Sequence, residues 1–201
     1  MKTIVSIVEG DGEVAALPIL LRRIGQWLSP ELHCHVLPPI RVRRDQFLNR
    51  EDVFRRQLEL ASLKCTNNGW ILVLLDADDD CPAELGSAIV SRAQKVIPHK
   101  PVSVVLANKE YEAWFIASAS SMHGERGFSF VDSVHDPESI RGAKEWLSER
   151  KQEGRYREVT DQPALSARMD IKLARQNSRS FHKLCSEWEK NMHKDPMVSQ
   201  D

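Results

Sequence analysis

The sequence predicts an α/β fold: a doubly wound, mainly parallel four-stranded sheet with helices on both faces, followed by a C-terminal helical extension. Through the first half of the chain, short β-branched runs alternate with stretches that place apolar residues at helical spacing. The run at 71–75 is aliphatic at every position, which is typical of a central parallel strand covered on both faces. Alternation of strands and helices with connections of this length gives a parallel sheet wound in the right-handed sense.

The individual elements follow from these patterns in order. A first strand is predicted at 3–9 and a helix at 13–28, where Pro18 indicates a late start or a kink because proline lacks the amide hydrogen. The next elements are a second strand with a proline-broken end at 32–42, a helix at 51–65, the central strand at 71–75, a helix at 82–97 that has Pro82 near its first turn, a fourth strand at 101–108 and the start of a further helix at 109–118.

After about residue 120 the composition changes to a small, polar loop and then to helical patterns. These patterns lie at 137–153, 164–177 and 179–192. A region of this length cannot build a large core alone, so we expect residues 120–201 to form a helical extension packed on an α/β domain of residues 1–119. Residues 193–201 are expected to fray.

Composition narrows the possible classes of protein. The chain has 201 residues, 41% of them apolar, and a formal net charge of −1, so no global field draws it to nucleic acid or to a membrane. The four cysteines form no CxxC pair, which indicates a reducing compartment. No signal peptide and no apolar run long enough to span a membrane is recognisable, so we expect a soluble, cytoplasmic protein.

Acidic residues follow two strands of the predicted sheet. Glu9 ends the first strand and Asp76 ends the central one, and parallel strands present their carboxyl ends at one edge, where ligands bind. In an extended segment Asp78 and Asp80 point the same way as Asp76. Glu13, in the first turn of the following helix, lies over the same edge. The sequence therefore predicts a cluster of carboxylates at one crevice.

Such a cluster is costly unless a cation neutralises it, because neighbouring carboxylates raise each other's pKa values. Oxygen ligands without histidine or thiolate favour Mg²⁺, Mn²⁺ or Ca²⁺ over zinc. The alternative interpretation is a solvated acidic turn after the strand, with Glu13 stabilising a helix N-terminus. A phosphate-binding loop is excluded, because "EGDGE" lacks the lysine and the spacing of that motif. The glycines instead allow the sharp turn that aims both glutamates at the crevice.

These motifs resemble those of the TOPRIM fold of topoisomerases, bacterial primases and related nucleases. "IVEGDGE" at 7–13, followed by a strand that ends in "DAD" at 76–78, is similar to the glutamate and DxD motifs of that family, over residues 3 to about 119. The second glutamate resembles the overcoming-lysogenization-defect (OLD) nucleases, which bind two divalent ions. The resemblance implies metal binding by Glu9, Glu13, Asp76 and Asp78, with Asp80 where a third acid of the family often lies.

Three later segments extend the resemblance. "EYEAW" at 110–114, "TDQPALSARMD" at 160–170 and "SRSFHKL" at 178–184 are similar to an uncharacterised TOPRIM-like bacterial family whose members often neighbour an ATPase in phage-defence gene pairs. The resemblance thus implies an antiviral nuclease that cleaves phosphodiester bonds with Mg²⁺ or Mn²⁺ and works with an ATPase partner. DNA and RNA both remain possible substrates, and the oligomeric state stays open.

The implied chemistry assigns roles to several residues and leaves others open. Glu9 or Glu13 could act as general base, and Lys109 is placed to neutralise a phosphate in the transition state, although a solvated lysine is an equal alternative. Glu110 and Glu112 either add a metal ligand or simply begin a helix.

A basic run, "RVRR" at 41–44, offers a nucleic-acid contact through Arg41, Arg43 and Arg44, and its alternative is a solvated face. Two other functions compete with the nuclease. A receiver-like signalling module would use Asp11, Asp76 and Lys109, and a non-catalytic binding or regulatory subunit would keep the fold without the chemistry.

Overall fold

A parallel β-sheet with the strand order β2-β1-β4-β5 forms the centre of the molecule, and β3 also pairs with β1. The structure is a computed structural model and describes residues 1–131 and 134–193. The strands are β1 (Lys2–Val8), β2 (Cys34–Val36), β3 (Ile40–Arg41), β4 (Trp70–Asp76) and β5 (Val102–Ala107). The predicted α/β class with a mainly parallel sheet is confirmed.

The predicted count of four strands is wrong, because the segment 32–42 forms two short strands in the described part of the chain. Pro38 and Pro39 separate β2 from β3, and neither proline can donate to the ladder. Both short strands still run along β1, since Leu37 N donates to Ile4 O and Val42 N donates to Val8 O. The chain therefore reaches the carboxyl end of β1 despite the interruption.

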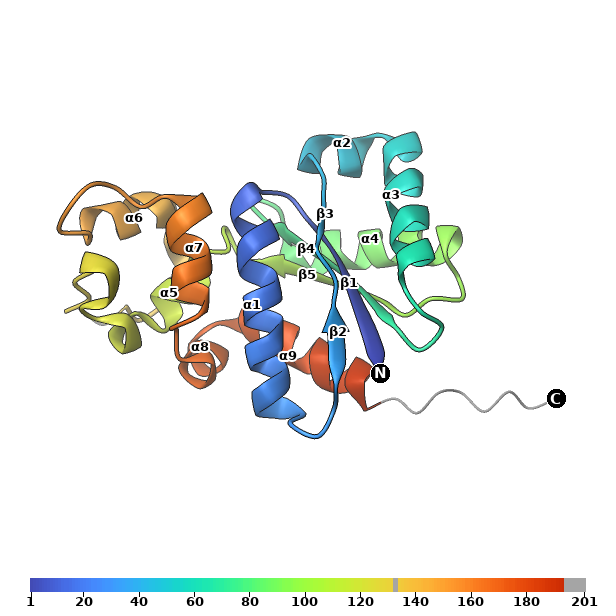
Figure 1. Ribbon diagram of the computed structural model, residues 1–201. Helices are drawn as coiled ribbons and strands as arrows, with labels where there is room; N and C mark the ends of the chain where they lie inside the picture. The colour runs from blue at the N-terminus through green and yellow to red at the C-terminus, as the bar shows by residue number, and fades with distance from the viewer. Residues whose placement is uncertain (132–133, 194–201) are drawn as a thin grey trace.

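Helices cover both faces of this sheet (Figure 1). The α-helices are α1 (Asp11–Leu28), α2 (Arg44–Asn49), α3 (Glu51–Lys64), α4 (Pro82–Val96), α5 (Ala113–Ala117), α6 (Ala143–Glu149), α7 (Glu158–Ser166), α8 (Ile171–Asn177) and α9 (Arg179–Met192). Helix α1 starts at Asp11 and runs through Pro18, so the late start, one of the two effects expected of Pro18, is wrong. Asp11 and Glu13 in the first turn favour the early start electrostatically. Helix α2 was not predicted from the sequence.

Alternating side chains of the strands supply two separate cores. On one face Leu72 and Val105 pack with α1 and α9, and the ring of Trp188 meets Trp70 edge-on at 6.2 Å between centroids. On the other face Val73 and Leu106 pack with α3 and α4. The last helix of the chain is thus part of the main core, because it covers the sheet beside α1.

The region after residue 120 departs from the predicted helices. The stretch predicted at 137–153 is a 3₁₀ turn followed by α6, since Gly142 at φ +68° interrupts the helix. The stretch predicted at 164–177 is divided into the end of α7 and the whole of α8, which is capped by Asp170 through the backbone amides of Lys172 and Leu173. Helix α7 lies along α1 on the side away from the sheet (Figure 1).

No helix in the described ranges is both long enough and apolar enough to cross a membrane. The fraying expected at the C-terminus concerns residues 194–201, which lie outside the described residues.

Two helical glycines give a matched test of this packing. A Cβ atom at Gly25 of α1 would lie 2.7 Å from Cζ2 of Trp188, whereas a Cβ atom at Gly86 of α4 meets no atom within 4 Å. We expect Gly25→Ala to lower the free energy of unfolding by about 1–3 kcal/mol through overpacking. Gly86→Ala should raise it by about 0.5–1 kcal/mol, because alanine favours the helix. Urea unfolding of both variants measures the difference, and equal effects would contradict the α1–α9 contact.

Candidate functional site

The carboxyl ends of β1 and β4 meet at the topological switch point of the sheet. From β1 the chain first builds β2 and β3 on one side and then returns to build β4 on the other. Open α/β sheets bind ligands at this point, because the two connections leave it in opposite directions. Glu9 follows β1 directly, and Asp76 is the last residue of β4.

A polar cavity of about 390 Å³ lies at this edge. Four acids predicted from the sequence contribute to its wall: Glu9, Glu13, Asp76 and Asp78. The rest of the wall consists of Gly10, Arg41, Val42, Arg43, Arg44, Asp45, Glu110, Lys144 and Glu158. Acids distant in the sequence therefore share one cavity, as the strand topology requires.

Asp76 is the most strongly perturbed of these acids. Its Oδ1 accepts a hydrogen bond from Tyr111 N at 2.8 Å, which fixes the carboxylate relative to the segment after β5. Burial, followed by the charges of Glu112 and Glu13, raises the pKa of Asp76 well above its ordinary value. Ionisation of Asp76 therefore carries a free-energy cost to the fold.

The glutamates of the first loop share this environment. Burial, followed by the charge of Asp78, raises the pKa of Glu9, and Arg44 partly offsets the effect. Glu13 is buried, and its Oε2 has no hydrogen-bond partner among residues 1–131 and 134–193. A Cβ atom at Gly10 would collide with that same oxygen, so glycine is required for the carboxylate to lie over the turn.

Two further acids, Glu110 in the cavity wall and the buried Glu112, lie close to these carboxylates. Glu112 is fully buried; its Oε1 accepts from the Tyr156 hydroxyl at 2.8 Å, and burial raises its pKa to about 7. The other carboxylate oxygen of Glu112 has no partner in the described part of the chain, and neither does Oε2 of Glu110. Oxygens without partners mark a site that lacks cationic or hydrogen-bonding ligands.

Arg44 supplies one of the cations of the site. Its guanidinium contacts Asp78 Oδ2 at 3.3 Å and Asp80 Oδ2 at 2.6 Å, and its Nε donates to the carbonyl oxygen of Asp76 at 3.0 Å. Asp78 adopts the left-handed conformation at φ +51°, which only a few residue types tolerate. Arg44 therefore stabilises the acidic turn from across β1.

Lys144 supplies another cation, from α6 in the C-terminal extension. Burial lowers its pKa, but Glu112, Glu158 and Asp76 more than reverse this effect, and the net result is a raised pKa. Its Nζ lies 2.9 Å from Glu158 Oε1. Lys144 and Glu158 were not predicted from the sequence, because neither belongs to a strand-end motif and both lie far along the chain from Asp76.

Several predicted residues have other neighbours. Asp80 is not in the cavity wall and binds Arg44. Lys109 Nζ contacts Asp79 Oδ1 at 3.1 Å and is also absent from the wall. Arg41 lies at the cavity mouth, where its Nε contacts Asp11 Oδ1 at 3.1 Å. Of the basic run, then, Arg44 and Arg41 are both engaged with acids of the protein.

The acids of the cavity are of the type that binds a metal ion, but their side chains are not positioned together as a complete set of ligands. In the part of the chain that the structure describes, no group of three or more His, Cys, Asp or Glu side chains is arranged to hold a metal ion. The carboxylate of Asp78 is paired with Arg44 and is therefore not free to bind a metal ion in this arrangement. The oxygen ligands nevertheless suit a hard divalent ion, because such ions prefer carboxylates. In addition, the buried Oε2 of Glu13 has no hydrogen-bond partner among the described residues.

Comparison with known proteins places the chain in a family. The profile of the family described as "Domain of unknown function (DUF4276)" matches residues 8–189, nearly the whole chain. The chain belongs to the DUF4276 family. The match includes both strand ends of the site and all helices of the C-terminal extension up to Glu189. No curated protein and no solved structure matches this DUF4276 chain.

The buried Glu112 should destabilise the wild type increasingly as the pH rises, and we expect Glu112→Gln to abolish this effect. The folded pKa is about 7 and the unfolded value about 4.3, so the folded protein binds more protons between them and its free energy of unfolding falls as the pH rises through that window. The variant should gain about 3 kcal/mol relative to the wild type between pH 4 and pH 8, by urea unfolding.

The low end of that range serves as the internal control. Near pH 4 Glu112 is neutral in the folded wild type, as the glutamine of the variant is at every pH. The difference in the free energy of unfolding measured there therefore reports every other effect of the substitution. A difference that stays constant across the range would contradict the burial of an acidic Glu112.

Proposed function

We propose that this protein is a divalent-metal-dependent phosphodiesterase, a nuclease acting on DNA or RNA. One observation carries the proposal: four carboxylates from the ends of β1 and β4 and the start of α1 line one cavity at the switch point, and a buried oxygen of Glu13 there has no partner among the described residues. Their order along the chain is that of the TOPRIM-like motifs, and the sheet is parallel at both strand ends.

The residues that would hold Mg²⁺ or Mn²⁺ are Glu9, Glu13, Asp76 and Asp78. The raised pKa values of Glu9 and Asp76 indicate carboxylates that an added cation would stabilise. When bound, one or two such ions supply Lewis-acid activation of a phosphodiester and of water. For Asp78 to take part, its contact with Arg44 must loosen, so metal binding should reorganise the turn after β4.

The cations of the protein would then act on the substrate. Once a metal ion neutralises the carboxylates, Lys144 and Arg44 have positive charge available for phosphate oxygens at the same cavity. Arg41 and Arg43 line the mouth, where a nucleic-acid backbone would enter. This basic surface is small and the net charge is −1, which supports a nuclease that acts with a partner protein. The resemblance to defence nucleases suggests an ATPase in that role.

A non-catalytic subunit is the second candidate, and Arg44 favours it. An arginine that already binds Asp78 and Asp80 neutralises the acidic turn without any metal. A receiver-like module has less support, because Lys109 contacts Asp79 rather than Asp76. Metal-dependent cleavage of a nucleic acid separates the nuclease from both alternatives.

The test uses a matched pair within the "DADDD" segment. Asp76 lines the cavity, whereas the exposed Asp79 binds Lys109 and Arg141 outside it. With Mn²⁺, cleavage of single- and double-stranded DNA and RNA should fall at least about 100-fold in Asp76→Asn, because one ligand is lost. Asp79→Asn should cleave like the wild type, and calorimetric titration should show Mn²⁺ binding by the wild type and Asp79→Asn only.

Two results would refute the proposal. One is wild-type protein that binds no Mn²⁺ in the calorimeter. The other is equal cleavage by Asp76→Asn and the wild type, which would identify a contaminating nuclease. Unfolding curves of all three proteins show whether Asp76→Asn keeps the fold, as expected from its retained acceptor oxygen for Tyr111 N.

A further inference from the structure

Strand β5 forms an open edge of the sheet. In the described part of the chain it pairs only with β4. Ile71 N donates to Pro101 O and Ala77 N donates to Ala107 O, so the odd-numbered residues of β5 face β4. The backbone groups of Val102, Val104 and Leu106 therefore point outward, away from the sheet. An unpaired strand edge is a template for a further strand.

A groove of about 730 Å³ follows this edge over its whole length, from Val102 to Asn108. Helix α4 forms one wall with small or uncharged residues: Pro82, Ala83, Gly86, Ser87, Val90, Ser91 and Gln94. At Gly86 a Cβ atom would meet nothing within 4 Å, so this wall stands clear of the rest of the protein. The groove is thus wide enough for an extended backbone to approach β5.

The opposite wall, from α9, is basic. Arg179, Lys183 and Lys190 all line the groove, and their spacing places them on one face of the helix. The acids on the same wall have partners within the protein: Glu187 accepts from Ser103 and Lys183, and a second acid, Glu138, is described below. The pair of Glu187 and Lys183 is thus internally neutralised, and Arg179 and Lys190 are the cations of this wall that have no ion pair among the described residues.

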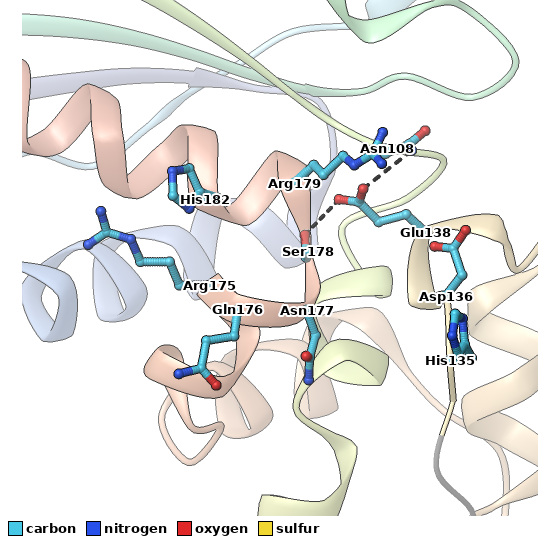
Figure 2. A pocket seen from close by; sticks show the side chains of 10 residues that line it. All are labelled: Asn108, His135, Asp136, Glu138, Arg175, Gln176, Asn177, Ser178, Arg179 and His182. Atoms are coloured by element: carbon cyan, nitrogen blue, oxygen red, sulfur yellow. Dashed lines mark hydrogen bonds between the residues drawn. The ribbon is translucent and has the colours of Figure 1, made fainter.

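At the carboxyl end of β5 the groove opens into a second cavity, of about 530 Å³ (Figure 2). Asn108, Glu138 and Arg179 line both spaces. Glu138 Oε1 accepts from Ser178 Oγ at 2.6 Å and from Ser180 N at 2.8 Å, so it occupies the amino end of α9 (Figure 2). Arg179 forms no ion pair with any described residue and is available at this junction.

We propose that the β5 edge binds an extended, acidic segment of a partner protein, which adds a strand to the sheet. The outward backbone groups of β5 supply the ladder hydrogen bonds, and the α4 wall accepts aliphatic side chains at alternate positions. The α9 wall selects carboxylates through Arg179 and Lys190, since Lys183 is paired with Glu187. Binding at this edge is independent of whether the acidic cavity is catalytic, since the two sites share no lining residue.

Charge argues against a second copy of the chain as the occupant. Two β5 edges related by a twofold axis would bring two α9 helices together on one face of the joined sheet. Their basic rows would then face each other, which is unfavourable. A nucleic acid fits less well too, because the α4 wall carries no cation and the outward peptide groups would remain without ladder partners.

The test is fluorescence anisotropy with a labelled peptide of the same length as β5 that alternates valine with threonine and carries aspartates at both ends. Two control peptides have lysines in place of the aspartates, or N-methyl groups on alternate backbone amides. We expect binding of the acidic peptide and at least about ten-fold weaker binding of each control, since one lacks the charge and the other the ladder donors.

A matched pair of variants locates the binding site. Gly86→Leu projects a side chain into the groove from a position where the Cβ atom meets nothing within 4 Å, whereas Ala88→Leu places the same side chain on an exposed position of α4 outside the groove. Gly86→Leu should abolish peptide binding and Ala88→Leu should retain it, with both variants folded by urea unfolding. In addition, Arg179→Glu should reverse the preference between the aspartate and lysine peptides.

Several results would overturn the inference. They are the absence of binding up to millimolar peptide, equal binding by Gly86→Leu and the wild type, and displacement of the peptide by a DNA or RNA oligonucleotide. Self-association of the wild type that Gly86→Leu abolishes, measured by analytical ultracentrifugation, would identify a second copy as the occupant instead.

Discussion

Carboxylates gathered at the switch point repel one another, and the elements around the cavity are arranged so that cations offset this repulsion. Burial raises the pKa values of Glu9 and Asp76 and places their charges where water cannot screen them well. Two cations offset that repulsion, and they come from opposite directions. Arg44 follows β3 and Lys144 belongs to α6, so both the strand pair beside β1 and the C-terminal helices are needed around one cavity.

This constraint gives the C-terminal extension a role in the site. Helix α6 contributes Lys144, α7 contributes Glu158, and the hydroxyl of Tyr156 binds the buried Glu112. The extension also packs on α1 and, through α9, on the sheet. A chain truncated near residue 119 would therefore lose Lys144 and part of the core together.

Sequence patterns predicted the parallel sheet and the gathering of Glu9, Glu13, Asp76 and Asp78, because strand-end position alone determines the edge on which a residue lies. The same patterns could not predict Lys144, since its place depends on how α6 packs against the sheet domain rather than on any local period. Two interruptions were also not predicted. Pro38 and Pro39 divide β2 from β3, and Gly142 interrupts the helix that was predicted at 137–153. The ion-pair partner of a single charged residue, such as Asp79 for Lys109, depends on the geometry of a turn, which the spacing of residues in the sequence does not determine.

We propose that this cavity receives a hard divalent cation between acids of β1, α1 and β4. Anomalous X-ray diffraction from crystals soaked in Mn²⁺ is the decisive measurement, because the signal locates manganese without reference to activity. We expect an anomalous peak bounded by Glu9, Glu13 and Asp76, with Arg44 displaced from Asp78. Crystals that take up manganese only elsewhere on the surface, with the Arg44–Asp78 contact intact, would contradict it.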